Sequence, residues 1–506
     1  GIKSLAVSFM HSTINPMHEL ALESLAYKLG FEYVSLSHRV SSVANYISRT
    51  ETAVFDAYLS PYLKQYTQKL EGLLNIKNIL YMQSDGSLCN ANRFKGYNAL
   101  LSGPAGGLIG ATHAAKKQGE KKIICFDMGG TSTDVSIYGG EVQINYHPEF
   151  HGIKLLTPMM DIHTVAAGGG SILSYDDGRL KVGPESAGAY PGPACYQNGG
   201  PLTITDANLF LGRIDPEKFP KVFGPNQNCG LDKKIVREKF NELSKDSGLT
   251  ALELAEGFIE VAVETMSRAI HKVSVEKGLD PKEFTLVSFG GAGGQMALKV
   301  AESLRIESVL IHPLSSVLSA FGIGQAQVGL RLNGRFVDGH NSLKIEMEKK
   351  LDSKSFDSTP FFLLRAKDSN HEFQIQAESY YLASEKFKTL YQQTFGIALQ
   401  GPPVCDTIVL KSHIKEHSHQ LEFKSSPESI NDEGLISENN TCLVVEKNWS
   451  GKRFENGVWQ FKFEPKEQVK NIRDERIELE IFYQRFQFIA EQMGLTLKRL
   501  ARSVNI

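Results

Sequence analysis

One short segment, residues 122–138, constrains the fold of this chain more than any other. It reads as a strand, the turn Asp127-Met-Gly-Gly-Thr-Ser-Thr-Asp134, and a second strand. A turn between two such strands exposes several backbone N–H groups to an anion. Gly129 and Gly130 permit positive φ angles there and place no Cβ in the way. We therefore predict a phosphate-binding hairpin, because a plain hairpin turn needs neither two carboxylates nor two threonines.

The side chains of the same turn supply the chemistry of a nucleotide site. Thr131 and Thr133 can donate hydroxyl hydrogen bonds. Asp127 stands where a carboxylate can hold Mg²⁺ through water, since Mg²⁺ prefers a few oxygen ligands and keeps several waters. Asp134 can orient an attacking group or the shell of the metal. The turn thus predicts a site for a phosphate group and Mg²⁺, with Asp127 and Asp134 as the catalytic candidates and Asp127 as the metal ligand.

Further glycine clusters can also bring backbone N–H groups close to a phosphate. The first is a backbone cradle for phosphate or a flexible bend: Gly168, Gly169, Gly170 and Ser171. The second lies between a strand and a helix, where a helix N-terminus suits a nucleotide. Its glycines are Gly290, Gly291, Gly293 and Gly294. A further cluster, the loop Ser102–Gly107, leads into a helix. The sequence contains no GxxxxGK[ST] motif, which excludes a P-loop.

Composition excludes several other classes of protein. The 506 residues are 41% hydrophobic, enough to fill real cores and to exclude wholesale disorder. A formal net charge of -2 does not show the excess of positive charge that is typical of a nucleic-acid binder. No apolar run reaches about 18 residues, so we expect no membrane span. The six cysteines form no CxxC pair, which indicates reduced thiols in a cytosolic protein rather than a zinc cluster.

The composition and the residue pattern of the chain change along its length. Glycine clusters, short strands and helices fill residues 100–330. Beyond about residue 335, glycine thins out and alternating apolar and polar residues predict a β-rich domain. Within it, residues 424–440 read as a polar loop. Residues 467–502 carry an amphipathic helical pattern.

Taken together, the motifs resemble the actin, sugar-kinase and Hsp70 type of ATPase, an α/β fold with ribonuclease H-like lobes. A longer string is more specific and resembles the hydantoinase A/oxoprolinase family: Val165–Ser171, Val182–Tyr196, Thr205–Leu209 and Leu211–Arg213. The end of the chain, Phe482–Ile506, resembles the start of a hydantoinase B-type half. The resemblance implies four parts: the end of an N-terminal lobe (1–75), an A-type ATPase domain (76–334), a β-rich C-terminal domain (335–465) and the start of a B-type half (466–506).

The resemblance implies an enzyme that opens a cyclic amide at the expense of ATP. ATP would phosphorylate the lactam oxygen of 5-oxo-L-proline, and water would cleave the activated amide to glutamate. Asp127, Gly129, Gly130, Thr131 and Asp134 match the second phosphate motif of the family, and the two later glycine clusters match its remaining nucleotide loops. The implied partners are a hydantoinase B-type half, fused or separate, and further copies of the chain. The same loops also suit an N-substituted hydantoinase or an ATP-dependent ketone carboxylase component.

The sequence departs from the family in one respect. The family begins with its own Asp-x-Gly-Gly-Thr-x-x-Asp loop, whereas this sequence has one copy, at residues 127–134. We expect the first copy upstream of Gly1, so half of the phosphate site and most of the B-type half would be absent here. ATP turnover by the chain alone is therefore not expected, and a non-catalytic nucleotide-binding module is a third hypothesis.

Other polar residues in the matching strings are weaker candidates. Asp206 and Glu185 either contact substrate or metal or are satisfied turn carboxylates. Cys195 is a nucleophile if a base lowers its pKa, and a packed thiol otherwise. Three histidines flank the hairpin and either bind a metal or are hydrogen-bonded imidazoles: His147, His151 and His163.

Overall fold

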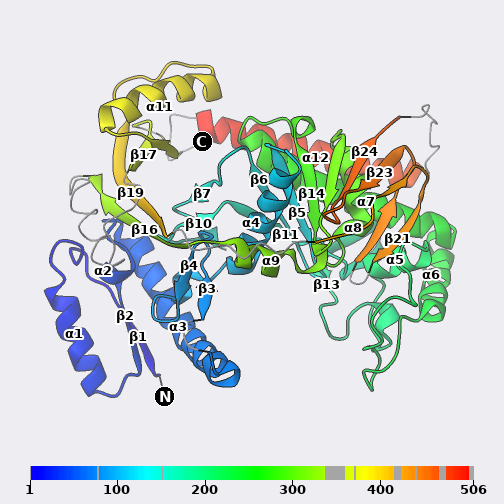
Figure 1. Ribbon diagram of the computed structural model, residues 1–506, viewed down its shortest axis with the longest axis horizontal. Coiled ribbons are helices and arrows are strands. Elements are labelled where there is room, and N and C mark those ends of the chain that lie inside the picture. The colour runs from blue at the N-terminus through cyan, green and yellow to red at the C-terminus, as the bar shows by residue number, and fades with distance from the viewer. Residues whose placement is uncertain are drawn as a thin grey trace.

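The computed structural model describes residues 2–76, 79–150, 152–176, 178–336, 359–367, 369, 372–414, 423–438, 441–465 and 475–500. Its two largest sheets have eight and six strands. Helices cover both faces of the larger sheet, and a separate N-terminal unit lies beside the six-stranded sheet (Figure 1). The mixed α/β fold expected from the sequence is therefore present.

The larger sheet has the strand order β11-β6-β5-β14-β15-β24-β23-β20. Its strands are β5 (Ile123–Met128), β6 (Thr133–Tyr138), β11 (Ile162–Val165), β14 (Thr285–Phe289), β15 (Ser308–Ile311), β20 (Glu428–Ile430), β23 (Trp449–Arg453) and β24 (Trp459–Phe463). The first three form an antiparallel meander, and β14 and β15 continue it parallel to β5. This is the arrangement of a ribonuclease H-like lobe. Three later strands extend it, with β24 antiparallel to β15.

Alternation along β5 explains why both faces of this sheet are covered. Ile124 and Phe126 enter one core and Ile123 and Cys125 the other, because successive strand residues point to opposite faces. The helices of the first core include α5 (Ile204–Phe210), α6 (Lys233–Ser247), α7 (Ala251–Glu276) and α8 (Gly293–Ser303). The second core packs under α4 (Ser102–Lys117) and α9 (Leu318–Gln325). A continuous apolar strand buried on two sides is typical of such α/β sheets.

The start of α7 follows its sequence signal. Thr250 and Glu253 form a reciprocal capping box, which satisfies N–H groups of the first turn. At the other end, Gly278 follows the helix with φ +68°, a conformation that glycine adopts without a Cβ penalty. In the sequence, Thr250 as N-cap and Gly278 as C-cap predict a helix over residues 251–277, and α7 matches this prediction to within one residue.

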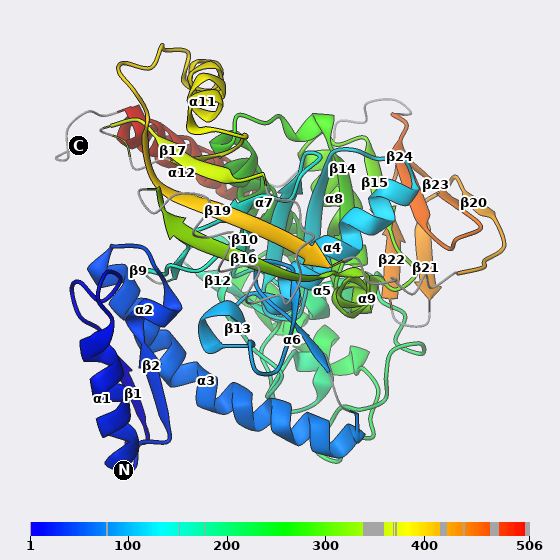
Figure 2. The same cartoon turned by 60° about the vertical axis from the view of Figure 1, so that its left-hand side comes forward.

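The smaller sheet has the order β18-β17-β19-β16-β4-β3. Its strands are β3 (Leu80–Met82), β4 (Leu88–Asn90), β16 (Val328–Arg335), β17 (Phe361–Arg365), β18 (Glu372–Gln376) and β19 (Val404–Ile414), and α11 (Tyr380–Phe395) packs on β17 and β18. Figure 2 shows β16 and β19 crossing in front of the larger sheet. Residues 359–465 therefore contribute to both sheets, and the four domain limits drawn from the sequence stay a prediction.

Residues 424–440 correct one expectation. They were expected to form a polar loop, yet they contain β20 and β21 (Gly434–Glu438). β20 pairs with β23, and β21 pairs with β22 (Thr441–Val445). Strand pairing with distant or following residues overrides the polar composition of the segment, as β-propensity depends strongly on context.

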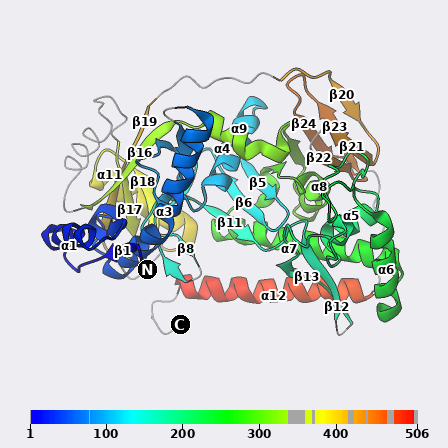
Figure 3. The same ribbon diagram turned by 90° about the horizontal axis from the view of Figure 1, so that it is seen from below.

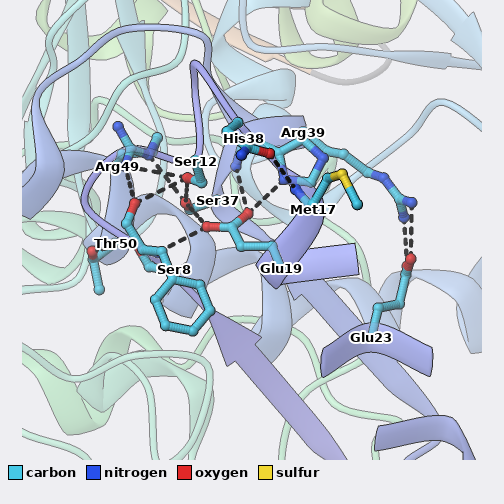
Figure 4. Close-up of polar contacts among 12 residues, drawn as sticks. Ser8, Ser12, Met17, Glu19, Glu23, Ser37, His38, Arg39, Arg49 and Thr50 are labelled. Carbon is cyan, nitrogen blue, oxygen red and sulfur yellow. Dashed lines mark hydrogen bonds and ion pairs between the residues drawn. The ribbon is translucent and has the colours of Figure 1, made fainter. Parts of the chain in front are cut away.

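The N-terminal unit is held together by a buried polar network. It comprises β1 (Ser4–Val7), α1 (Met17–Lys28), β2 (Tyr33–Leu36) and α2 (Ser37–Val40), packed on the long helix α3 (Tyr46–Leu74). Arg49 of α3 is fully buried and donates to the Ser37 hydroxyl and the Phe9 carbonyl, while Glu19 accepts from Ser37 and His38 (Figure 4). A buried charge is tolerated because each of these groups is hydrogen-bonded.

The last described element, α12 (Glu475–Leu500), runs along α7 and β13 (Arg179–Ser186) (Figure 3). Ile477 and Ile481 enter the main core, and the ion pair of Arg485 with Glu264 spans 3.0 Å. The amphipathic helix expected over 467–502 is confirmed over the described residues 475–500. Among the described helices, none combines the length and the apolar character that crossing a bilayer requires.

Candidate active site

The predicted strand–turn–strand hairpin is present. Asp127 on β5 lies opposite Asp134 on β6, and the turn closes through the Gly129 N–H group, which donates to the Ser132 carbonyl at 3.0 Å. Neither Gly129 nor Gly130 has a positive φ, so that expectation was wrong. Glycine at position 130 instead leaves the outer side of the turn unobstructed. An added Cβ there would project into open space, with no atom of the protein within 4 Å. The outer side of the turn is open.

The two carboxylates stand side by side without a cation. Burial, and then the negative charge of Asp134, raise the pKa of Asp127 to about 7. Burial also raises the pKa of Asp134, although a 2.6 Å hydrogen bond from the Thr164 hydroxyl opposes the shift. In the described part of the chain, no lysine or arginine forms an ion pair with either residue. Half-buried carboxylates without a counter-charge fit a hydrated divalent cation.

The loop Gly168–Ser171 is hydrogen-bonded to the backbone of the hairpin turn. Gly169 and Gly170 donate their N–H groups to the carbonyls of Gly129 and Gly130. Gly168 donates to the Ser171 hydroxyl at 2.9 Å. These three N–H groups are therefore used within the protein. The arrangement favours support of the hairpin over direct contact with phosphate.

Two threonines strengthen this support. The Thr133 hydroxyl donates to the Ala167 carbonyl, so its hydrogen is not directed at a ligand. Thr205 donates through its hydroxyl and its N–H group to the Gly169 carbonyl, at 2.9 and 2.8 Å. Sequence reasoning missed this role of Thr205, although the residue opens one of the matching strings. Thr131, by contrast, lines an open pocket.

The turn between β14 and α8 reaches the hairpin at one residue. Gly290 has φ +84°, and a Cβ there would come within 2.5 Å of the Asp127 Oδ1 atom. Its N–H group donates to the Ser315 carbonyl at 2.9 Å. Gly291 is open, whereas Gly293 and Gly294 begin α8 and turn inward, with Gly294 against Leu443. The structure therefore brings Gly290 to the carboxylates and places Gly294 in the core.

A pocket of about 830 Å³ opens beside the hairpin. Gly130, Thr131 and Gly170 form one side of it. The lining also includes the stacked rings of Tyr196 and Phe223, whose centroids are 3.9 Å apart. Amide side chains and backbone supply the remaining polar groups, and no lining residue is charged. Tyr196 belongs to the matching string Val182–Tyr196, whereas Phe223 lies outside the matching strings and has no spacing typical of a site.

Asp206 and Cys195 are structural. The Asp206 carboxylate accepts N–H groups of Ala194, Cys195 and Thr203 at 2.8 to 3.0 Å and is fully buried. Burial raises the pKa of the Cys195 thiol far above its usual range, and the adjacent carboxylate adds to the shift. A thiolate nucleophile is thus disfavoured. Glu185 is exposed on β13.

The histidines near the hairpin have other partners. His147 Nδ1 lies 2.9 Å from Glu372, and His163 Nε2 lies 3.4 Å from Asp161. His151 lies outside the described residues. Within the described ranges, no three His, Cys, Asp or Glu side chains are grouped closely enough to hold a metal ion. A site formed by Asp127 and Asp134 would need water or nucleotide oxygens as its further ligands.

The Ser102–Gly107 cluster is helical and not a loop, contrary to expectation. It forms the first turns of α4, where Gly106 lies against the Ser319 carbonyl of α9. A Cβ at Gly106 would come within 2.6 Å of that oxygen. These glycines therefore permit the close approach of two helices, a role that a glycine-rich string cannot distinguish from a ligand loop.

The strand order and the hairpin define an α/β protein of the actin and Hsp70 type. The hydantoinase/oxoprolinase family model matches residues 49–331, more than half of the chain. The chain therefore belongs to the hydantoinase/oxoprolinase family.

Named relatives refine this assignment. The 5-oxoprolinase of Saccharomyces cerevisiae is 50% identical over 339 residues, which cover 65% of this chain and 26% of that protein. The 5-oxoprolinase 1 of Arabidopsis thaliana is 35% identical over 582 residues, covering 100% of this chain and 46% of that protein. The chain thus spans less than half the length of these relatives.

A bacterial relative also has a solved structure. Caprolactamase subunit alpha of Pseudomonas jessenii is 34% identical over 356 residues, covering 67% of this chain and 50% of that protein. A crystal structure of the ATP-dependent caprolactamase from that organism superposes with a TM-score of 0.74 at 24% identity, covering 90% of this chain and 77% of that chain. The fold of the two proteins is the same.

Proposed function

We propose that this chain is the nucleotide-binding part of an ATP-dependent hydrolase that opens the lactam 5-oxo-L-proline. The observation that carries the proposal is the open hairpin turn bordered by the pair Asp127 and Asp134, with which no described lysine or arginine forms an ion pair. Open backbone N–H groups suit phosphate oxygens, and paired carboxylates suit a phosphate-bound cation. The names of the relatives indicate the substrate class.

The chemistry explains why ATP is needed. An unstrained lactam is a poor electrophile. Transfer of the γ-phosphoryl group to the lactam oxygen breaks the terminal P–O bond of ATP and releases ADP, leaving a carbon that water can attack. Two waters are consumed overall, the ring C–N bond breaks, and the products are glutamate, ADP and phosphate. Phosphoryl transfer of this kind depends on positioning and charge neutralisation.

In this proposal, the hairpin binds the phosphates. The N–H group of Gly130 and the hydroxyl of Thr131 would orient the transferred group, while Gly168–Ser171 hold the hairpin in place. Gly129, whose N–H group and carbonyl are both used within the protein, would shape the turn. Gly290 would close the nucleotide side next to Asp127. Asp127 and Asp134 would hold Mg²⁺ through its waters. The cation would supply neutralisation of the phosphate charge.

The pocket beside Thr131 would receive the lactam. It shares Gly130 and Thr131 with the hairpin, so a ring placed there lies next to the phosphate loop. Its uncharged lining suits the amide part of the ring, and side-chain amides such as Gln197 can hydrogen-bond the ring C=O and N–H groups. The lining supplies no counter-charge for the carboxylate of 5-oxo-L-proline. Hydantoins are cyclic amides as well, so an N-substituted hydantoinase remains the second candidate.

Asp127→Ala tests the proposed role of the carboxylates. Mg-ATP binding is measured by calorimetry on this chain, and 5-oxoproline-dependent phosphate release on the chain supplied with a hydantoinase B-type half and the first phosphate loop. We expect loss of phosphate release by at least about 100-fold, with an unchanged circular dichroism spectrum. Asp280→Ala, an exposed carboxylate distant in the fold, is the control. Unchanged turnover in Asp127→Ala would refute the proposed role of Asp127. In the unmodified protein, nucleotide binding without any phosphate release would favour a non-catalytic module.

The exposed side of α12 is the proposed contact with the B-type half. Ile477 and Ile481 point into the core, yet large apolar side chains recur along the opposite side. Their exposed fractions are 67% for Leu479, 52% for Phe482, 69% for Phe486, 52% for Ile489, 63% for Met493 and 61% for Leu497. A continuous apolar stripe of this kind marks an interaction surface.

Two observations favour a B-type half as the occupant. The Arabidopsis relative aligns with all of this chain yet contains as much polypeptide again, and the caprolactamase relative is named a subunit. Phe486→Glu should abolish co-purification with a B-type half, whereas Gln487→Glu, the exposed polar neighbour, should not. Equal binding by both variants would contradict this interface, and dimerisation of the chain alone through α12 would assign the stripe to a second copy.

A further inference from the structure

A second, smaller pocket lies on the α4 face of the main sheet. Its volume is about 290 Å³. It is formed by α4, by the segment that follows β15, by α9 and by residues next to β24. It shares no lining residue with the pocket beside the hairpin. The proposed function leaves it without a role.

His312 is the buried polar group of this pocket. Its side chain is 6% exposed and stacks on Phe321, with centroids 4.7 Å apart. Its Nδ1 atom accepts the Leu314 N–H group at 3.1 Å. A neutral imidazole that accepts at Nδ1 carries its proton on Nε2. Among the described residues, none accepts a hydrogen bond from Nε2, so this donor is left for a ligand.

The imidazole is neutral in the free protein. Burial, together with the nearby His113 and Lys117, lowers the pKa of His312 to about 4. Burial and neighbouring lysines also lower the pKa of His113. The same positive surroundings that disfavour a charged imidazole attract a negative ligand.

The rim of the pocket is positive as well. Lys117 and Lys424 line it, against the single carboxylate of Glu455. All three side chains belong to exposed residues, so they can adjust to a ligand without cost to the core. The floor is aromatic, with Phe321 and Phe423 around the imidazole. A buried N–H donor below a lysine rim is suited to the oxygens of a small anion.

We propose that this pocket binds a small oxyanion of amino-acid size, a carboxylate or phosphate, through His312 Nε2 and the ammonium groups of Lys117 and Lys424. Organic carboxylate and inorganic phosphate share the required chemistry, and both are products of the reaction proposed above.

The pocket is connected to the nucleotide turn through the backbone. The Ser315 N–H group donates to the His312 carbonyl at 2.8 Å, and the Ser315 carbonyl accepts from Gly290 at 2.9 Å. Gly290 in turn lies against Asp127. An anion on His312 is therefore expected to change nucleotide affinity, whichever lactam or hydantoin the protein acts on.

Calorimetry with the chain separates the two ligand sources. L-glutamate and inorganic phosphate are titrated in separate arms at low ionic strength, and binding of at least one is expected at millimolar concentration or below. Lys117→Gln and Lys424→Gln should each weaken it about fivefold. Lys116→Gln is the matched control, because the adjacent Lys116 lies over the Tyr138 ring and does not line the pocket.

Three results would overturn the proposal. The first is no binding of either anion. The second is equal weakening by Lys116→Gln and Lys117→Gln. The third is phosphate binding that Lys117→Gln leaves unchanged, which would place the anion at the hairpin. None of these results depends on lactam hydrolysis, so failure of the proposed function leaves this test intact.

Discussion

Two glycine-rich loops meet at the site and use glycine for opposite reasons. The hairpin turn at Gly129 and Gly130 is open on its outer side, where an added Cβ would meet almost nothing. The loop at Gly168–Gly170 is pressed against that turn, and a Cβ on Gly168 would lie 2.7 Å from the Ser132 nitrogen. The first loop keeps space for a ligand. The second removes side chains so that two backbones can hydrogen-bond.

Because of this difference, the hairpin turn serves ligand binding and the supporting loop serves stability within one site. Glycine in the hairpin adds little to packing, and the adjoining carboxylates oppose folding at neutral pH because they are half-buried and close together. Glycine in the supporting loop allows the hydrogen bonds that hold the hairpin. A substitution in the support should therefore change stability, and one in the hairpin should change binding.

The largest effect is expected at the supporting loop. Gly168→Ala forces a Cβ into backbone atoms of Thr131 and Ser132, which cannot rotate away as a side chain would. We expect the free energy of unfolding to fall by about 2–3 kcal/mol. Chemical denaturation followed by circular dichroism measures this loss. A change below about 0.5 kcal/mol would remove the distinction between the loops.

A smaller effect is expected from pH. The folded pKa of Asp127, about 7, lies above its unfolded value of about 3.9, so the folded protein binds more protons between these values. Stability should fall as the pH rises from about 4 to 7, by on the order of 2 kcal/mol. Asp127→Asn should lose most of this dependence, apart from the part that comes from the raised pKa of Asp134, and be more stable than the unmodified protein at pH 8. Parallel pH profiles for the two proteins would contradict the prediction.

The smallest effect is expected at the hairpin itself. Gly130→Ala meets no atom within 4 Å, so the free energy of unfolding should stay within about 0.5 kcal/mol. The new methyl group occupies the open side, and ATP affinity by calorimetry should fall about fivefold, close to 1 kcal/mol. A stability loss as large as that of Gly168→Ala would show that the hairpin is packed in solution.

The sequence predicted those features that neighbouring residues determine. The hairpin follows from the residue types at 127–134, and the limits of α7 follow from Thr250 and Gly278. The support role of Gly168–Gly170 could not be predicted, because the hydrogen-bond partners lie at a distant point of the chain. The pocket wall around Tyr196 and Phe223 depends in the same way on how loops fold back on the site.

The order of strands in the main sheet also determines how late in synthesis the sheet can be completed. β15 is paired on one side by β14 and on the other by β24, whose Trp459 and Phe461 are almost fully buried. During synthesis, the edge of β15 stays uncovered until β24 leaves the ribosome. An unpaired hydrophobic strand edge is a template for aggregation, and such non-local pairing is slow. A fragment ended at residue 334 would keep the whole hairpin and still be expected to aggregate, because the strand that closes its sheet comes later in the chain.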